Sequence, residues 1–553
     1  MCGIFACFAR PCAVETSKAL LALKHRGPDR ASQVSIQKDH KDQHVLAHTR
    51  LTVFAVKDGE QPITHSAITL VANGEIYNHE ALKADPSVKD KAYTASDCSG
   101  IIAAYETYGK SSMCQVIQAL DGFFVFVLHD GETDTVLAAR DPFGITSMYY
   151  AVVTDDSGLP PTIAFASEAK ALLAINGAHI YNFPPGSFYH SAASAFSPDG
   201  FHRYAPVLSD IPIRAETDAA LVRETLCTAV KKRLMVEAPF GVLLSGGLDS
   251  SLIASIAARL TRDTHGPLKT YSIGLKGAPD HIAALQVAAH IKSDHTAFEF
   301  TVDQALDALP DVIRHLETFD ITTIRASTPM YLLSKYIKTQ GLKMVLSGEG
   351  SDELFGGYLY FHSAPSDKEF HDECVGRLEQ LHLFDCLRAN KSTMASGIEA
   401  RVPFLDAALV EAVLSLPIAS RRPLPGPSGK PIEKYLLRDA FRGDWLPDEI
   451  LWRAKEQFSD GVGFSWIDSL KQTADLKVTD VQFADRANTF PNKTPATKEA
   501  YWYRCMFNDL FGDRLDLADT VELWVPRGDW GCPSDPSGRA QAVHTDYKPD
   551  TME

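Results

Sequence analysis

The segment from Phe240 to Ser251 constrains the chain most, because it joins a buried strand to a helix through a loop suited to an anion. Residues Phe240 to Leu244 form a continuous apolar run with the length and branching of a strand buried in a parallel sheet. Apolar residues then recur at helical spacing between Leu252 and Leu260. The intervening loop, Ser245 to Ser250, must therefore turn the chain and begin the helix.

The residues of this loop have the chemistry of a phosphate site. Gly246 and Gly247 allow backbone amides to approach a ligand closely, and the hydroxyls of Ser245 and Ser250 add donors. The N-terminus of the following helix contributes positive partial charge. Asp249 stands where a Walker loop would lead to lysine, and an acid beside a phosphate indicates magnesium. The loop therefore predicts a site for phosphate or pyrophosphate with Mg²⁺, and the alternative is an ordinary glycine-rich turn.

A second acidic loop follows the strand predicted at Lys343 to Leu346. Strands and helices alternate in this half of the chain, which predicts a doubly wound parallel sheet with ligands at the carboxyl ends of its strands. The loop from Ser347 to Glu353 would lie at that edge, and it carries three acids. Asp352 could hold Mg²⁺ together with Asp249, and Glu349 is a candidate general base. The alternative is a helix with an acidic first turn.

The N-terminal half has a different pattern. Residues 1 to about 205 contain short apolar or alternating runs typical of strands, with helices between them, which predicts two packed sheets with helices outside. Cys2 would carry both a thiol and a free α-amine once the initiator methionine is removed. Because an α-amine has a pKa of about 8, the amine could act as the base for its own nucleophile.

Four further residues have the chemistry that such a nucleophile would need. The Asn73 side-chain amide and the Gly74 backbone N–H could stabilise a tetrahedral oxyanion. Arg50 could bind a carboxylate and Asp97 an ammonium group, which together suit a free α-amino acid. Taken singly, Asn73-Gly74 could be a hairpin turn and Arg50 a surface arginine.

Combinations of motifs in both halves resemble known families. The N-terminal half resembles the class II, N-terminal nucleophile glutamine amidotransferases, on the motifs His25 to Asp29, Arg50 to Val53, Asn73 to Asn78 and Ser96-Asp97. The loop from Ser245 to Ser250 resembles that of the N-type ATP pyrophosphatases. With the stretches Thr322 to Pro329, Glu399 to Asp406 and Lys455 to Gly461, this half is similar to the synthetase domain of glutamine-hydrolysing asparagine synthetases, nearer the bacterial than the animal pattern.

The resemblance implies a fold and a domain order. We expect an α+β N-terminal nucleophile hydrolase sandwich of α/β/β/α layers over residues 1–205. An α/β doubly wound parallel-sheet ATP-pyrophosphatase domain would follow over residues 206–515, after a linker at about Ser197 to Glu216. Proline, glycine and charge dominate residues 516–553, which predicts an irregular tail.

The resemblance also implies roles for individual residues. The catalytic groups would be Cys2, Asn73, Gly74 and Glu349. Glutamine would contact Arg50, Leu51, Val53, Asn73, Gly74, Glu75 and Asp97. ATP would contact Leu244, Ser245, Gly246, Gly247, Asp249, Ser250, Ile273, Ser347, Gly348 and Lys455. Aspartate would contact Thr322, Thr323 and Arg325, and the metal ligands would be Asp249 and Asp352.

The reaction implied is the ATP-dependent synthesis of asparagine from aspartate. Cys2 would release ammonia from glutamine through a thioester, and ammonia would attack a β-aspartyl-AMP, giving AMP, pyrophosphate and glutamate. ATP and Mg²⁺ would be required, and relatives suggest a homodimer. Two alternatives stay open: a related synthetase that adenylates another carboxylate, as in β-lactam formation, and a non-catalytic homologue.

Composition limits the partners of the chain. At 553 residues it is too long for one ordinary core, and its formal charge of -16 opposes nucleic acid or an anionic membrane as a main partner. No apolar run approaches the roughly 18 residues of a membrane span. Ten cysteines are scattered without CxxC pairs or close Cys/His clusters, which speaks against zinc and against a disulfide framework and favours the cytosol.

Overall fold

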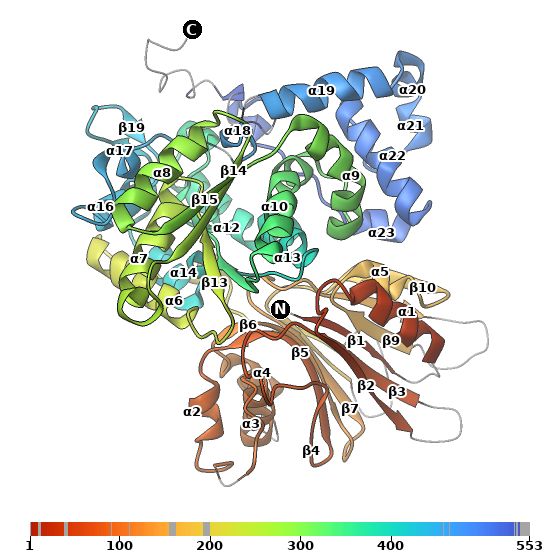
Figure 1. The fold of residues 1–553 in the computed structure, drawn as a ribbon. Helices are drawn as coiled ribbons and strands as arrows, with labels where there is room; N and C mark the ends of the chain where they lie inside the picture. Colours follow the sequence, from red (N-terminus) through yellow and green to blue (C-terminus); the bar gives the residue numbers. More distant parts are fainter. Residues whose placement is uncertain are drawn as a thin grey trace.

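The computed structural model describes residues 2–8, 13–37, 43–89, 91–109, 111–153, 162–191, 200–456, 458–463 and 465–535, with residues 537, 540, 541 and 543. Two domains lie against each other, one holding the strands of the N-terminal half and one holding the helices and parallel sheet of the C-terminal half (Figure 1). None of the described helices is long and apolar enough to cross a membrane.

The N-terminal domain is a sandwich of two antiparallel sheets. The first has the order β10 (Ala178–Asn182), β8 (Tyr149–Val153), β9 (Thr162–Ala166), β1 (Gly3–Cys7), β3 (Gln43–Arg50), β2 (Arg30–Gln37). The second has the order β12 (Phe201–Arg203), β11 (Ser187–His190), β7 (Thr135–Arg140), β6 (Gly122–Asp130), β5 (Ile68–Ile76), β4 (Ile63–His65). Helices α1 (Ala13–Leu23) and α5 (Ala169–Leu172) pack on the first sheet, and α2 (His79–Lys83), α3 (Ser99–Tyr108) and α4 (Met113–Gln118) lie beside the second (Figure 1).

Alternation along the strands explains these layers. Ile4 and Ala6 of β1 pack between the two sheets, in one cluster with Val125 of β6. Phe5 of β1 points to the other face, where it joins a cluster with Leu23 of α1. Because successive strand residues face opposite sides, β1 is apolar on both faces and every one of its residues is buried. The predicted α/β/β/α sandwich is confirmed.

The C-terminal domain is built on a five-stranded parallel sheet of order β15 (Asp294–Glu299), β14 (Lys269–Gly274), β13 (Phe240–Leu243), β16 (Met344–Leu346), β17 (Glu399–Arg401). The chain runs from β13 outward to β15 and then returns to the other side of β13 as β16. Strand order therefore reverses between β13 and β16, where ligands bind in doubly wound folds. The predicted parallel sheet is confirmed, and both predicted ligand loops follow these two strands.

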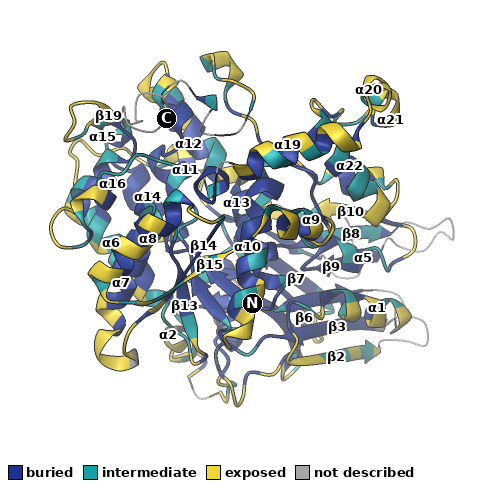
Figure 2. Ribbon diagram, turned by 45° about the horizontal axis from the view of Figure 1, so that its top comes forward, coloured by how far each residue is buried: buried dark blue, intermediate teal, exposed yellow. Residues whose placement is uncertain are grey.

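Helices surround this sheet, and the connections carry the rest of the domain. The helical segments and the remaining strands are η2 (Leu208–Asp210), α6 (Ala219–Lys232), α7 (Leu248–His265), α8 (Pro279–Ile291), α9 (Val302–Leu316), α10 (Ile321–Thr339), α11 (Ser351–Phe355), η3 (Leu359–Ser363), α12 (Asp367–Gln380), η4 (Leu381–Leu383), α13 (Asp385–Met394), η5 (Pro403–Leu405), α14 (Ala407–Leu414), α15 (Ile418–Arg421), β18 (Leu424–Pro425), β19 (Pro431–Ile432), α16 (Tyr435–Ala440), α17 (Asp448–Leu451), α18 (Phe458–Gly461), α19 (Ser465–Lys477), α20 (Asp480–Ala484), α21 (Arg486–Thr489), α22 (Lys498–Phe511), α23 (Leu515–Asp519) and η6 (Gly528–Trp530). The inner strands and α10 are largely buried, whereas the edge strands β2 and β15 and the helices α20 and α21 have no buried residue (Figure 2). Residues 197–199 of the predicted linker lie outside the described residues.

The segment after residue 515 packs against the rest of the chain, although beyond residue 519 the described residues form no regular element except η6. Its first residues form α23, and Asp516 of that helix accepts a hydrogen bond from the Ile180 N–H of the N-terminal domain at 3.0 Å. Trp524 is 5% exposed, and its backbone N–H donates to Asp320 Oδ1 at 2.9 Å. An aromatic side chain in a proline-rich stretch therefore anchors the chain to the domain. Residues 544–553 of the predicted tail lie outside the described residues.

Two candidate active sites and the interface between them

The Cys2 site lies at the start of β1. The thiol lies against the loop after β3, where the Leu51 N–H donates to Cys2 Sγ at 3.4 Å. The Cys2 backbone nitrogen is 2.5 Å from Asn73 Oδ1. Burial raises the pKa of the Cys2 thiol. The structure thus brings together the predicted nucleophile and the predicted oxyanion residue from strands of the two different sheets.

Asn73 and Gly74 lie within β5, so the alternative of a hairpin turn is wrong. Asn73 Oδ1 is engaged by Cys2, whereas Asn73 Nδ2 is buried without a hydrogen-bond partner among the described residues. Gly74 has a φ of +144°, and a Cβ there would lie 2.0 Å from the Phe123 carbonyl oxygen. A buried amide donor left without a partner is costly, and a bound ligand would satisfy it.

The other residues predicted to bind the substrate glutamine lie around Asn73, with the exception of Glu75. Leu51 and Val53 are buried, and Arg50 Nη2 donates to the Ala55 carbonyl at 2.7 Å. Asp97 accepts from the Ile76 N–H at 2.8 Å, two residues beyond Gly74, and burial raises its pKa. The arginine and the aspartate are thus each held in place by the backbone.

Glu75 is the exception, because its carboxylate pairs with the other domain. Arg401 of β17 places Nη2 2.9 Å from Glu75 Oε1 and Nε 2.6 Å from Glu399. Burial raises the pKa of Glu75, and Arg401 opposes that rise. The Glu75 side chain therefore contributes to the domain interface.

The second site is a cavity at the carboxyl ends of β13 and β16. It is lined by almost all of the predicted synthetase residues, namely Leu244, Ser245, Gly247, Asp249, Ser250, Ile273, Thr322, Thr323, Ser347, Gly348, Glu349, Asp352 and Lys455. Gly246 is not among the lining residues. Its φ is +79°, and a Cβ there would lie 2.5 Å from Ala284 N of α8, so this glycine permits the close approach of that helix.

A network of charges connects the two loops of this cavity. Lys434 places Nζ 2.7 Å from Asp249 Oδ2 and 2.6 Å from Asp352 Oδ1. Lys455 Nζ lies 2.7 Å from Asp352 Oδ2. Although burial opposes it, Lys434 and Lys455 hold the pKa of Asp352 well below its usual range. The sequence analysis did not identify Lys434, which stands in no phosphate-loop motif.

The same contacts bear on the predicted metal site. Asp249 and Asp352 both direct a carboxylate oxygen at one cationic nitrogen, so the two side chains converge on a position suited to a cation. Carboxylate oxygens are the ligands that Mg²⁺ prefers in proteins. The donor set therefore fits Mg²⁺, with Lys434 moved aside or sharing the two carboxylates.

A second group of charges surrounds Glu349. Arg388 of α13 forms ion pairs with Glu349 and with Asp385. The Tyr358 hydroxyl lies 2.8 Å from Asp385 Oδ2 and also contacts the Glu353 carboxylate. Burial raises the pKa of Glu349, and Arg388 opposes this effect. Arg388 and Asp385 were not predicted from the sequence, because their proximity to Glu349 depends on the packing of α13. Tyr358 stands in the Gly356-Gly357-Tyr358 motif of the same family resemblance, but no role was predicted for it.

The structure does not bring Arg325 to the cavity, in contrast to Thr322 and Thr323. Arg325 is 3% exposed and forms two hydrogen bonds to Glu499 of α22, at 2.9 Å from Nε and 2.6 Å from Nη2. A third contact of 3.4 Å reaches Asp535. The guanidinium group therefore holds α10 to α22 and to the C-terminal segment, and the prediction of an aspartate contact is corrected.

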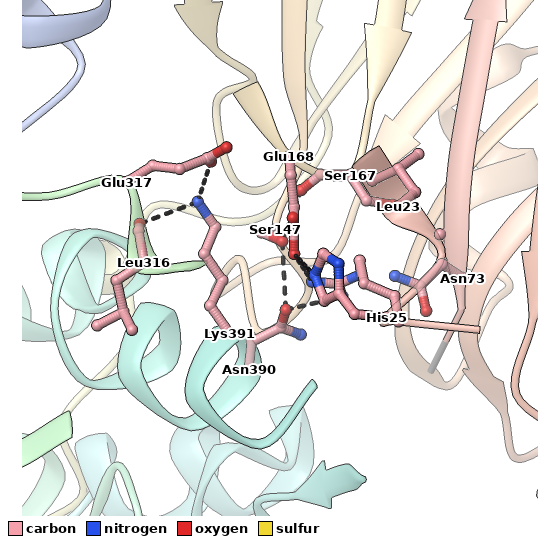
Figure 3. A network of polar contacts seen from close by, with 12 residues as sticks. Leu23, His25, Asn73, Ser147, Ser167, Glu168, Leu316, Glu317, Asn390 and Lys391 are labelled. Carbon is pink, nitrogen blue, oxygen red and sulfur yellow. Dashed lines mark hydrogen bonds and ion pairs between the residues drawn. The ribbon is translucent and has the colours of Figure 1, made fainter. Parts of the chain in front are cut away.

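Helix α13 also contributes Asn390 and Lys391 to a polar network at the domain interface (Figure 3). Arg26 donates to the Cys2 carbonyl and to Asn390 Oδ1 of α13, each at 2.9 Å. The next residue, Lys391, is fully buried and donates to Tyr149 of β8 at 2.8 Å and to Glu317 at 2.5 Å. One helix thus pairs with Glu349 through Arg388 and, two residues later, reaches the Cys2 carbonyl indirectly through Asn390 and Arg26.

Comparison with known proteins agrees with these two sites. A family model described as a glutamine amidotransferase domain matches residues 1–189, and one described as asparagine synthase matches residues 221–370 and 363–528. A probable glutamine-hydrolysing asparagine synthetase of Schizosaccharomyces pombe is 48% identical, covering 98% of this chain and 99% of its own. The chain belongs to the glutamine-hydrolysing asparagine synthetase family.

Two further family members match over similar lengths. Asparagine synthetase [glutamine-hydrolyzing] 1 of Saccharomyces cerevisiae is 46% identical over 98% of this chain and 99% of its own. The asparagine synthetase of Zea mays is 43% identical over 98% and 94%. The predicted family and enzyme class are confirmed, whereas the predicted nearness to the bacterial pattern is not tested by these relatives.

Proposed function

We propose that this chain forms L-asparagine from L-aspartate, ATP and the amide nitrogen of glutamine, and releases glutamate, AMP and pyrophosphate. The observation that carries the proposal is the contact of the Cys2 nitrogen with Asn73 Oδ1, which leaves the buried Asn73 Nδ2 available to a ligand. The family membership and the charged cavity of the second domain support the same reaction.

In the first half-reaction the Cys2 thiol attacks the side-chain amide carbon of glutamine. The free α-amine of Cys2, once Met1 is removed, takes the thiol proton and delivers it to the departing ammonia. The Asn73 amide and the Gly74 backbone N–H stabilise the oxyanion. Arg50 and Asp97 bind the α-carboxylate and the α-ammonium group of glutamine. Water then hydrolyses the thioester to glutamate.

In the second half-reaction the Ser245 to Ser250 loop binds the phosphates of ATP. Its backbone amides and hydroxyls donate to the phosphate oxygens, while Lys455 and Lys434 offset their charge. Asp249 and Asp352 would hold Mg²⁺, which would supply positive charge to offset that of the pyrophosphate. The β-carboxylate of aspartate, bound near Thr322 and Thr323, attacks the α-phosphorus.

Ammonia then displaces AMP from the acyl adenylate. The attacking nitrogen must lose a proton, and Glu349 is the carboxylate we assign to accept it. Burial raises the pKa of Glu349, which favours its acceptance of a proton, and the ion pair with Arg388 opposes that rise. Ammonia released at Cys2 must reach this cavity before water protonates it, so we expect it to travel inside the protein.

The proposal extends to the setting of the enzyme. We expect a homodimer in the cytosol, on the basis of the family resemblance and of cysteines that suit a reducing compartment. Nucleic acid and membrane are not expected as partners, because the formal charge is -16. Light scattering during gel filtration would test the dimer directly.

A product analysis tests the reaction. Purified protein is given ATP, Mg²⁺, aspartate and glutamine, and a Cys2→Ala variant is given ammonium in place of glutamine. The wild type is expected to give asparagine, AMP and pyrophosphate with glutamine. The Cys2→Ala variant is expected to give the same products only when ammonium is the nitrogen source. Glutamate without asparagine from the wild type would preserve the glutaminase assignment and overturn the aspartate assignment.

A further inference from the structure

Two histidines and an aspartate form a cluster in the N-terminal sandwich, away from both active sites. His44 lies in β3, His129 in β6, and Asp134 in the turn between β6 and β7. One potential ligand atom from each of them lies within 4.8 Å of the other two. Since β3 and β6 belong to different sheets, the cluster connects the two layers of the sandwich.

Two distances within the cluster match the spacing between ligands of one metal ion, and the third is within 4.8 Å. His44 Nε2 and His129 Nε2 each lie 3.2 Å from the same oxygen, Asp134 Oδ1. Ligands bound to tetrahedral Zn²⁺ at about 2.0–2.1 Å stand about 3.3 Å apart along each edge of the tetrahedron. A small shift of the three atoms would therefore place all of them around one ion.

The surroundings of the cluster favour metal binding. His44 and His129 are each 2% exposed, and the Phe8 ring lies 5.4 Å from the first imidazole and 6.2 Å from the second. An apolar wall strengthens the interaction between a cation and a carboxylate. Asp134 retains partial exposure, which gives an ion a route from solvent and room for a water ligand.

We infer that His44, His129 and Asp134 bind one divalent transition-metal ion, of which Zn²⁺ is the best match. Two imidazoles and one carboxylate suit Zn²⁺, whereas Mg²⁺ and Ca²⁺ prefer sets of oxygen ligands. The scattered cysteines argued against a zinc site, but that argument applies only to sites with cysteine ligands.

The ion would have a structural role. Phe8 stands six residues from Cys2 along β1, which at about 3.3 Å per residue places the cluster about 20 Å from the nucleophile. At that distance the metal cannot contact the reacting atoms. It would instead clamp the two sheets at the end of the sandwich opposite Cys2, so its removal lowers stability.

The test uses the full chain without a histidine tag, carrying Cys2→Ala so that the catalytic thiol cannot bind metal. The protein is stripped with a chelator and given one equivalent of Zn²⁺ or Co²⁺ in the presence of excess Mg²⁺. We expect one zinc per chain by elemental analysis and a rise in Tm of about 5 °C on zinc addition. Bound Co²⁺ should show the visible absorption bands of tetrahedral coordination.

Matched variants separate this site from adventitious binding. Asp134→Asn retains side-chain size and a hydrogen-bond acceptor, and His129→Gln removes one imidazole; each should lower zinc affinity at least about 100-fold and abolish the Tm shift. His179→Gln, at an exposed position of β10 in the same domain, should change neither. If the Cys2→Ala parent takes up no more metal than its Asp134→Asn derivative, or its Tm does not respond to zinc, the proposal is overturned.

Discussion

The two active-site regions are held together by different kinds of interaction. At the Cys2 site the contacts are short and largely uncharged: the Leu51 N–H to Cys2 Sγ, and the Cys2 nitrogen to the Asn73 amide. In the synthetase cavity they are ion pairs between distant elements, such as Lys434 with Asp249 and Asp352. The difference matches the ligands proposed for them, because the first site must attack a neutral amide and the second must hold a polyphosphate.

This difference has a consequence for mutation. In a site whose groups are held mainly by the backbone, the removal of one side chain should abolish one chemical step. The activity of the other site should change little. A network of buried charges should respond as a unit, because removal of one partner leaves another charge unpaired. The following experiments would sharpen or break this contrast.

Cys2→Ala should have the largest effect. Loss of the nucleophile should lower glutamine-dependent asparagine formation at least about 10⁴-fold, while ammonium-dependent formation stays within about twofold of wild type. Both rates are measured by asparagine production. Retention of glutamine-dependent synthesis by this variant would exclude Cys2 as the nucleophile.

Asp352→Asn should lower asparagine formation about 10³-fold with either nitrogen source, because it removes a carboxylate that Lys434 and Lys455 share and a proposed Mg²⁺ ligand. Glutaminase activity should persist. The matched control is Asp372→Asn, at a largely exposed ion pair with Lys368, which should change neither rate. Equal loss of both activities would show that the two sites are not separable.

Asn73→Ala should lower the glutaminase kcat about 10²- to 10³-fold, because it removes one oxyanion donor. KM for glutamine should change less, since the donor acts mainly in the transition state. Ammonium-dependent synthesis serves as the internal control and should be unchanged. A rise in KM at constant kcat would instead assign Asn73 to ground-state binding.

Asp320→Asn should have the smallest effect and a defined pH dependence. Burial raises the pKa of Asp320 to about 6, above its ordinary value of 3.8, at the N-cap of α10 beside the cavity. The folded state therefore binds the proton more tightly, so the free energy of unfolding should fall by about 2–3 kcal/mol as the pH rises from 4 to 7.

Asparagine cannot titrate but retains the oxygen that caps α10. The variant should therefore lack this contribution to the pH dependence of the free energy of unfolding. Urea unfolding of both proteins at several pH values measures the difference. The same slope in both proteins would assign the proton to another group.

The sequence predicted the parts of each site that depend on local conformation. A buried strand followed at once by Ser245 to Ser250 can only present that loop at the edge of a parallel sheet, and the structure places it there. The apolar run that begins at Cys2 likewise predicted a buried strand, and β1 starts directly after Cys2. The prediction for Arg325 was wrong because neighbouring residues indicate only that Arg325 lies in a helix. They do not indicate its partner, Glu499, which lies far along the chain on α22.

What the sequence determined by itself was the family, the two folds and the residues that stand in ligand loops, because motifs and backbone conformation depend on patterns of neighbouring residues. Only the tertiary structure decided which charges meet. Lys434, Arg388 and the pair His44 and His129 reach their partners across separate elements. Long-range pairing depends on the packing of whole layers and burial strengthens it, so no spacing in the chain encodes it.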